Sequence, residues 1–233
     1  DLRSTQLITI DGKNAKDFDD AVFAEELKSK KGWRILVAIA DVSHYVKEKS
    51  SLDNEARERG NSVYFPNLVV PMLPEELSNN LCSLKPDLDR ACLTVEIILD
   101  NNGIKQSHEF FQSVIKSAKR LTYEEVEEVI KKKTSTHNFD KSILNVINAL
   151  YNVYNLLEIQ REKRGALNLN LPEKVISFDD NGWPKNVDTI YGITSNKIIE
   201  ELMILANVAA AEEINKTTIN SVYRVHEPPS QEK

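Results

Sequence analysis

Cysteine is scarce in this sequence: Cys82 and Cys92 are its only two, and nothing near them has metal-ligand spacing. Two isolated thiols provide no disulfide framework, so we expect both to be buried and reduced. No apolar run approaches the roughly 20 residues that cross a bilayer, and the opening DLRSTQLITIDGK lacks the basic-then-apolar order of a secretory signal. We therefore expect a cytoplasmic monomer with no membrane partner.

An excess of basic residues is also missing. The chain has 30 Lys and Arg against 36 Asp and Glu residues, a formal net charge of −6. Proteins that bind nucleic acid mainly by releasing counterions are usually basic, so the overall charge argues against that mode of binding. It leaves open a metal-ion hydrolase, whose chemistry requires a local concentration of carboxylates.

Strand and helix patterns follow one another in irregular order. Apolar runs, alternation and turn residues predict strands over Thr5–Ile10, Ala21–Leu27, Arg34–Val42, Ala91–Leu99, Ile104–Ser117 and Ser221–Val225, with a strand pair across Lys174–Ile190. Capping and stop signals predict helices from Ser50 or Ser51 to Arg59, from Thr122 to about Lys132, from Lys141 to Arg164 and from Ser195 to Asn215. The order indicates an α+β (mixed α/β) fold, with mixed sheets flanked by helices.

Four aspartates are concentrated in the segment IDGKNAKDFDDAV: Asp11, Asp17, Asp19 and Asp20. Carboxylates crowded together repel one another, and a bound cation would relieve this repulsion. Mg²⁺ and Mn²⁺ prefer oxygen ligands, and two such ions about 4 Å apart suit phosphodiester hydrolysis. A solvated acidic turn is the plain alternative, and the spacing alone leaves both interpretations open.

Two other carboxylate sites fit less well. An EF-hand calcium loop that began at Asp11 would need glycine and glutamate where the chain has Lys16 and Val22. An aspartyl-phosphate phosphatase would place its paired aspartates directly after an apolar strand, but here the polar segment 13–16 precedes them.

Several motifs occur in a common order: IDGKNAKDFDDAV, VAIADVSHYV, SVYFP, VPMLPEELSNNLCSL, LTYEEV, RGALNLNLPE and YRVHEPP. Together they resemble the catalytic (RNB) domain of the ribonuclease II/ribonuclease R family, and they are closer to its ribonuclease R branch. The resemblance implies a 3′-to-5′ exoribonuclease that uses Mg²⁺ or Mn²⁺ to release nucleoside 5′-monophosphates from RNA with a single-stranded 3′ end. It implies Asp11, Asp17 and Asp20 as metal ligands, with Asp17 and Asp19 in the catalytic step.

The resemblance also implies four substrate-binding residues. Tyr64 matches an aromatic linked to choosing RNA over DNA, and Tyr123 matches the aromatic that stacks on the 3′-terminal base. Glu200 matches an acid that contacts the terminal ribose, with Glu201 as the competitor one residue along. Leu169 stands where the family usually has phenylalanine, so we expect a weaker clamp on the last base.

Three family features have no counterpart in residues 1–233: a later basic stretch with a catalytic arginine, and the cold-shock and S1 RNA-binding domains. We therefore expect residues 1–233 to be roughly the N-terminal two-thirds of the catalytic domain, incomplete at its C-terminus and weakly active or inactive alone. The alternative is an RNA-binding but catalytically incomplete module.

Overall fold

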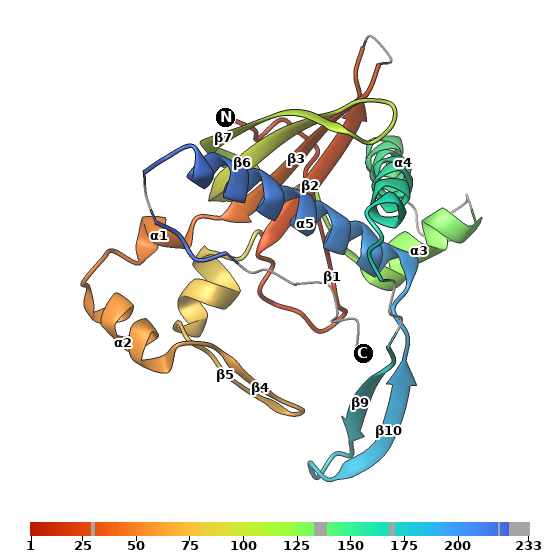
Figure 1. Ribbon diagram of the computed structural model, residues 1–233. Helices are drawn as coiled ribbons and strands as arrows, with labels where there is room; N and C mark the ends of the chain where they lie inside the picture. The colour runs from red at the N-terminus through yellow and green to blue at the C-terminus, as the bar shows by residue number, and fades with distance from the viewer. Residues whose placement is uncertain (29–30, 133–138, 168–170, 219, 224–233) are drawn as a thin grey trace, which may run out of the picture.

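The fold is known from a computed structural model, which describes residues 1–28, 31–132, 139–167, 171–218 and 220–223. Its centre is a six-stranded sheet in the order β7-β6-β3-β2-β1-β8 (Figure 1). The strands are β1 Ile8–Asp11, β2 Asp20–Glu26, β3 Trp33–Ala40, β6 Asp89–Leu99, β7 Lys105–Lys116 and β8 Lys119–Thr122. β1 and β8 pair in parallel and the other neighbours are antiparallel, so the predicted mixed sheet is confirmed.

The longest hairpin, β6–β7, turns where the sequence predicts it. The Asp100 side chain accepts hydrogen bonds from the backbone N–H groups of Asn102 and Ile104, at 2.8 and 2.9 Å. Gly103 completes the turn at φ 77°, a conformation that glycine adopts without a steric penalty.

Three helices cover one face of the sheet: α3 Tyr123–Lys132, α4 Lys141–Lys163 and α5 Thr194–Asn215 (Figure 1). Ile8 and Ile10 of β1 point toward this layer because alternate residues of a strand share a face. They join a core that includes Ile147 of α4 and Leu202 of α5, both fully buried. Among the helices of the described residues, none has the length and apolar character required to cross a membrane.

The opposite face is covered by irregular segments. The segment 12–19 and the π-helix η1 Leu77–Leu81 place Phe18, Leu77 and Cys82 against Leu36 and Ala38 of the sheet. The short helices α1 Val42–Tyr45 and α2 Ser51–Arg59 continue this layer. Both cysteines are free and buried, as predicted.

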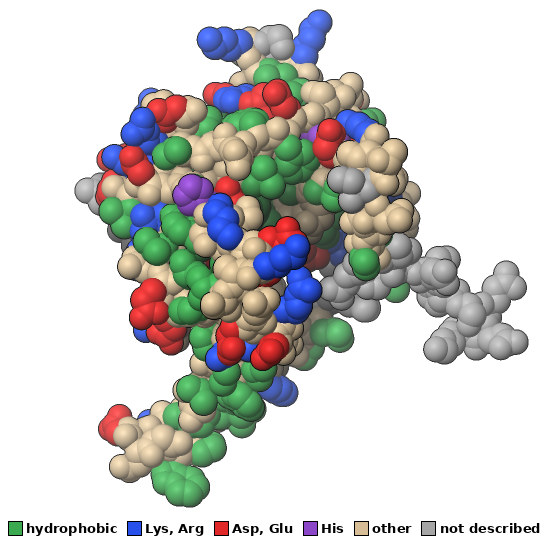
Figure 2. All heavy atoms as spheres, turned by 90° about the vertical axis from the view of Figure 1, so that its left-hand side faces the viewer, with side chains coloured by type: hydrophobic (Ala, Val, Ile, Leu, Met, Phe, Trp, Pro, Cys, Tyr) green, Lys and Arg blue, Asp and Glu red, His purple; other side chains and the backbone are tan. Residues whose placement is uncertain are grey.

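Two hairpins extend away from the sheet and its helices (Figure 1). One consists of β4 Val63–Phe65 and β5 Leu68–Val70, and the other of β9 Glu173–Phe178 and β10 Pro184–Ile190. All six strand residues of β4 and β5 are exposed, and Trp183 in the turn of the other hairpin is 72% exposed. The β9–β10 hairpin forms the projection at the foot of Figure 2, where apolar side chains reach the surface.

Several sequence-based boundaries are wrong. Ser195 does not cap α5, because Ile193 is the N-cap residue and Ser195 lies inside the first turn. There its backbone N–H donates to Glu127 Oε2 at 2.9 Å and its Oγ donates to the Tyr123 carbonyl at 2.8 Å. Ser221–Tyr223 is not a strand, and the remainder of that predicted element lies outside the described residues. The strand β8 was not predicted.

We expect Gly32→Ala to destabilise the fold more than any other alanine substitution at a described glycine. Gly32 has φ 140°, and a Cβ there would lie 2.0 Å from the Leu99 carbonyl oxygen, a backbone atom that cannot move aside easily. Strain and overlap of this kind cost about 2 kcal/mol or more, equivalent to roughly 4–8 °C of Tm in a chain of this size. Thermal unfolding followed by circular dichroism measures the loss. Gly12→Ala is the matched control, because a Cβ at Gly12 has nothing within 4 Å.

Candidate active site

The four aspartates lie around the junction of two neighbouring strands. Asp11 is the last residue of β1 and Asp20 is the first residue of β2, while Asp17 and Asp19 lie in the connecting segment 12–19. Because β1 and β2 are antiparallel neighbours, the end of one strand and the start of the next share one edge of the sheet. This topology explains why residues nine positions apart in sequence, 11 and 20, belong to one cluster. We call these four residues the aspartate cluster.

Burial and crowding raise the pKa values of three members of the aspartate cluster. Burial, followed by the neighbouring charge of Asp20, raises the pKa of Asp11 to about 7, while Arg120 opposes the shift. Burial and then Asp19 raise the pKa of Asp20 to about 6. For Asp19, reduced hydration of the carboxyl and the charge of Asp17 raise the pKa. Each shift disfavours the charged carboxylate, and a bound cation would oppose it.

The ligand chemistry of the cluster fits a divalent cation. Asp11 Oδ2 is buried and has no hydrogen-bond partner within the described residues. A buried polar atom of this kind normally has a partner, and carboxylate oxygen is the ligand that Mg²⁺ and Mn²⁺ prefer. However, no group of three or more His, Cys, Asp or Glu side chains among the described residues is arranged to hold a metal ion. The donor types are right, but the side chains do not form a finished ligand shell.

The backbone around the cluster is held by bonds to other elements. The Ala40 N–H of β3 donates to the Asp19 carbonyl at 2.9 Å, and the Leu84 N–H donates to the Phe18 carbonyl at 2.8 Å. Phe18 itself is 9% exposed, whereas Asp19 beside it is exposed. The buried ring and the two backbone bonds therefore anchor the segment between Asp17 and Asp20.

Tyr123 lies next to the aspartate cluster. It is the first residue of α3 and follows Thr122, which is paired with Asp11 in the β1–β8 register. The predicted capping box is confirmed: the Thr122 N–H donates to Glu125 at 2.7 Å, and the Glu125 N–H donates to Thr122 Oγ1 at 3.2 Å. Burial, together with the charges of Asp11 and Asp20, raises the pKa of Tyr123 to about 12. Its hydroxyl is therefore a proton donor at neutral pH.

Tyr64 has a different setting. It lies on β4 opposite Val69 of β5, and its side chain is 68% exposed. Leu169, the fourth predicted substrate-binding residue, lies outside the described residues. The β4–β5 hairpin thus presents the ring of Tyr64 to solvent.

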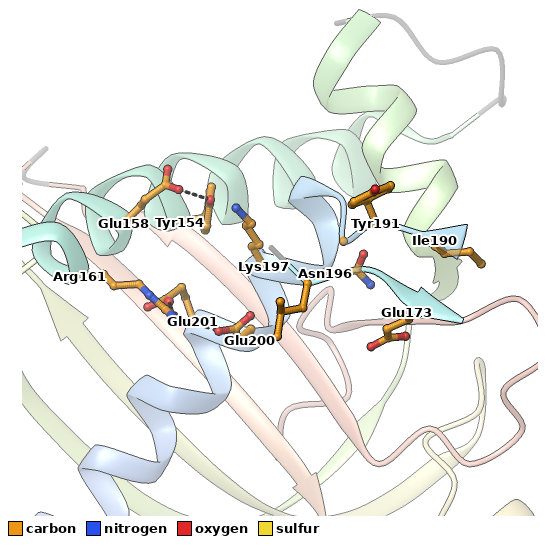
Figure 3. A pocket seen from close by; sticks show the side chains of 12 residues that line it. Tyr154, Glu158, Arg161, Glu173, Ile190, Tyr191, Asn196, Lys197, Glu200 and Glu201 are labelled. Carbon is orange, nitrogen blue, oxygen red and sulfur yellow. Dashed lines mark hydrogen bonds and ion pairs between the residues drawn. The ribbon is translucent and has the colours of Figure 1, made fainter. Parts of the chain in front are cut away.

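Glu200 lies in a pocket of about 310 Å³ between α4, α5 and the β9–β10 hairpin (Figure 3). Arg161 of α4 reaches across it and donates to Glu200 at 2.9 Å, and it also bonds to Glu201. Glu200 is about half exposed and Glu201 is buried, so Glu200 is the carboxylate that a ligand can reach. Among the described residues that line this pocket, none belongs to the aspartate cluster.

Comparison with known proteins matches this chain and its fold to one family. The RNB domain family matches residues 1–233. Ribonuclease R of Vibrio cholerae is 42% identical over 233 residues, which cover 100% of this chain and 28% of that protein.

Two solved structures of Mycoplasma genitalium RNase R superimpose closely. The complex with ribose-methylated single-stranded RNA has a TM-score of 0.93 at 34% identity, over 99% of this chain and 36% of that one. The complex with double-stranded RNA has a TM-score of 0.94 at 35% identity, over 100% of this chain and 41% of that one. The chain therefore spans well under half the length of these relatives.

Proposed function

The chain belongs to the RNB-domain family, and from that premise we propose that it carries the carboxylate site of a 3′-to-5′ exoribonuclease. The reaction is hydrolysis: water adds to the phosphorus of the last phosphodiester and the bond from phosphorus to the upstream O3′ breaks. That O3′ keeps the bonding electrons and takes up a proton, and a nucleoside 5′-monophosphate leaves. The observation that carries the proposal is the buried, unpartnered Asp11 oxygen within a cluster of like charges.

RNA is the proposed substrate because the similar RNase R structures contain single-stranded or double-stranded RNA. Acidic and basic side chains are intermixed on the face shown in Figure 2, so that face has no continuous basic track for the phosphate backbone. We propose that recognition depends instead on the cluster and on aromatic contacts, which bind bases irrespective of sequence.

We assign Asp11, Asp17 and Asp20 to a divalent cation and Asp19 to the attacking water. A bound Mg²⁺ or Mn²⁺ would lower the pKa of water and stabilise the leaving oxygen. Asp19 suits a role toward the attacking water because the residue is exposed at the surface of the cluster. Partial desolvation of its carboxyl raises the pKa, which favours taking up a proton.

The positions of Tyr64 and Tyr123 favour roles that are the reverse of those implied by the family resemblance: Tyr64 would stack on a base, and Tyr123 would contact the sugar. The exposed ring of Tyr64 is available for stacking on a base. Tyr123 lies beside Asp11 and Asp20, where its hydroxyl suits a hydrogen bond to the sugar, whose 2′-OH distinguishes RNA from DNA. Glu200 would accept a hydrogen bond from a ribose hydroxyl, and Leu169 would make apolar contact with the base.

A 5′-labelled oligo(A), incubated with the complete protein and Mg²⁺, tests the function. The expected products shorten from the 3′ end with nucleoside 5′-monophosphate released, and EDTA stops the reaction. Release of 3′-monophosphates, or degradation that EDTA does not affect, would contradict the proposal.

The rival function is an RNA-holding module without turnover, and the unfinished ligand shell favours it. Calorimetric titration with Mn²⁺ separates the two functions. Saturable binding that Asp11→Asn removes supports the nuclease, while RNA binding without any Mn²⁺ binding or hydrolysis supports the module.

We predict that Tyr64→Ala weakens RNA binding and that Tyr64→Phe does not. Base stacking on an aromatic ring contributes about 1–3 kcal/mol per base, so KM for oligo(A) should rise roughly 5- to 150-fold with a smaller change in kcat. Steady-state kinetics on both variants measures the effect. A large loss in Tyr64→Phe would instead assign the hydroxyl, and therefore sugar selection, to Tyr64.

A further inference from the structure

An arginine far away in the sequence holds the start of the segment that carries Asp17 and Asp19. Arg120 of β8 donates from Nη2 to the carbonyl oxygens of Gly12 and Lys13, at 2.6 and 3.1 Å. Its guanidinium carbon lies 5.5 Å from the centre of the Phe18 ring, within range of a cation–π contact. Its Nε is buried and makes no hydrogen bond within the described residues, so the two Nη2 bonds and the ring contact are what hold the guanidinium. Arg120 thus contacts the segment on both sides of Lys16.

A buried serine holds the same segment a few residues further along the chain. Ser83, which has no exposed surface, donates from Oγ to the Lys16 carbonyl at 2.8 Å and accepts from the Phe18 N–H at 3.1 Å. These two bonds flank Asp17 on its N-terminal and C-terminal sides. Phe18, whose backbone N–H donates one of these bonds, and Leu84, the next residue after Ser83, both belong to the buried cluster on this face of the sheet.

The geometry points to a consequence for the carboxylates. Phe18 is fixed inward by its ring, its N–H and its carbonyl. Mutual repulsion drives the aspartates apart, so the backbone must resist that force for the cluster to keep its spacing. We infer that Arg120 and Ser83 are positioning residues that hold Asp17 and Asp19 in register with Asp11 and Asp20. This inference rests on the proposed nuclease function, since it assigns the two side chains to that site.

The test compares three variants with two matched controls in the complete protein. The variants are Arg120→Met, Arg120→Lys and Ser83→Ala. The controls lose the same groups elsewhere on the sheet: Arg34→Met removes a partly buried arginine paired with Glu25 and Glu96, and Ser113→Ala removes a buried hydroxyl bonded to Thr94. Four quantities are measured: kcat and KM on oligo(A), Mn²⁺ affinity by calorimetry, and Tm in EDTA.

Residues that orient metal ligands typically change metal affinity or activity by roughly 10- to 100-fold when mutated. We expect Arg120→Met and Ser83→Ala to lower kcat and Mn²⁺ affinity by that amount, with KM within about twofold of wild type. Lysine keeps the charge and one donor, so Arg120→Lys should recover part of the loss. The controls should lower Tm while leaving kcat and Mn²⁺ affinity within about twofold of wild type.

The inference is overturned if the three variants lower Tm as the controls do and keep wild-type kcat and Mn²⁺ affinity. If Arg120→Met does not unfold cooperatively, Arg120→Lys and Ser83→Ala decide the question. If the wild-type protein does not hydrolyse RNA, the proposed function fails, and Mn²⁺ affinity then decides the positioning role by itself.

Discussion

Replacing Asp19 by asparagine is expected to lower kcat for RNA hydrolysis by about 10²- to 10⁴-fold, the range typical for loss of a proton-transfer group. The amide has nearly the same shape as the carboxylate, but it cannot take a proton from the attacking water. Asp19 is exposed, so the substitution should leave the fold intact. Binding of RNA should change little, because the aromatic contacts proposed for the substrate are retained. Single-turnover cleavage of oligo(A) measures the rate, and fluorescence anisotropy measures binding.

Asp89→Asn is the control for that experiment. Asp89 is an exposed aspartate at the start of β6, where it pairs with Arg3 and Lys116, outside the aspartate cluster. It should retain wild-type kcat. Hydrolysis at the normal rate by Asp19→Asn would show that Asp19 has no part in the chemical step.

The metal-free protein should become less stable as the pH rises from about 4.5 to 7. Asp11 has a pKa of about 7 in the folded protein against its usual 3.8, and Asp20 has a pKa of about 6. At a pH between the unfolded and the folded pKa, each of these carboxyl groups has lost its proton in the unfolded chain and keeps it in the folded chain. Stability from this source is therefore complete below about pH 4 and is lost as the pH passes through the folded pKa values. Glu212 and Glu213, whose pKa values are lowered, act in the opposite direction at more acidic pH.

Melting curves in EDTA at pH 4.5, 6 and 8 measure how the stability of the protein falls with pH. The Tm of Asp11→Asn should equal that of wild type at pH 4.5. At pH 8 it should be higher, by roughly 2–4 °C for each kcal/mol by which the substitution stabilises the fold. Mn²⁺ at 100 times its Kd should stabilise wild type at pH 8 by about 2.7 kcal/mol and Asp11→Asn much less. Equal melting of the two proteins at every pH would mean that Asp11 is not under electrostatic strain.

The local elements of the fold could be predicted because the signals for them lie within a few residues. The turn at Asp100–Gly103, the Thr122–Glu125 box and the helix stop at Gly165 are all of this kind. Ser195 shows where such signals fail. It resembles an N-cap, but its N–H donates to a distant carboxylate, Glu127, and the observed N-cap is Ile193, two residues earlier. β8 has four residues and little apolar periodicity, so only its pairing with β1 defines it as a strand.

The residues of the candidate site also differ in whether the sequence alone could reveal them. The aspartates could be found because all four fall within ten residues, and Tyr123 because the motif LTYEEV resembles one of the family's motifs. Arg120 and Ser83 could not, since 108 and 65 residues separate them from the backbone groups that they bind. No pattern in the sequence indicates which of the 30 basic residues lies under the aspartate segment. That information exists only once the sheet is assembled.

The parallel pairing of β1 with β8 has a consequence for synthesis on the ribosome. All four aspartates lie within residues 11–20, but Arg120 and Tyr123, together with the strand that pairs with β1, emerge about 100 residues after them. Contacts this distant in sequence form late in folding. A nascent chain would thus display its acidic residues long before they are organised, and the sheet edge that supports them would close last. Termination between residues 20 and 120 would yield a polypeptide that has all four aspartates of the cluster but lacks Arg120, Tyr123 and the strand β8.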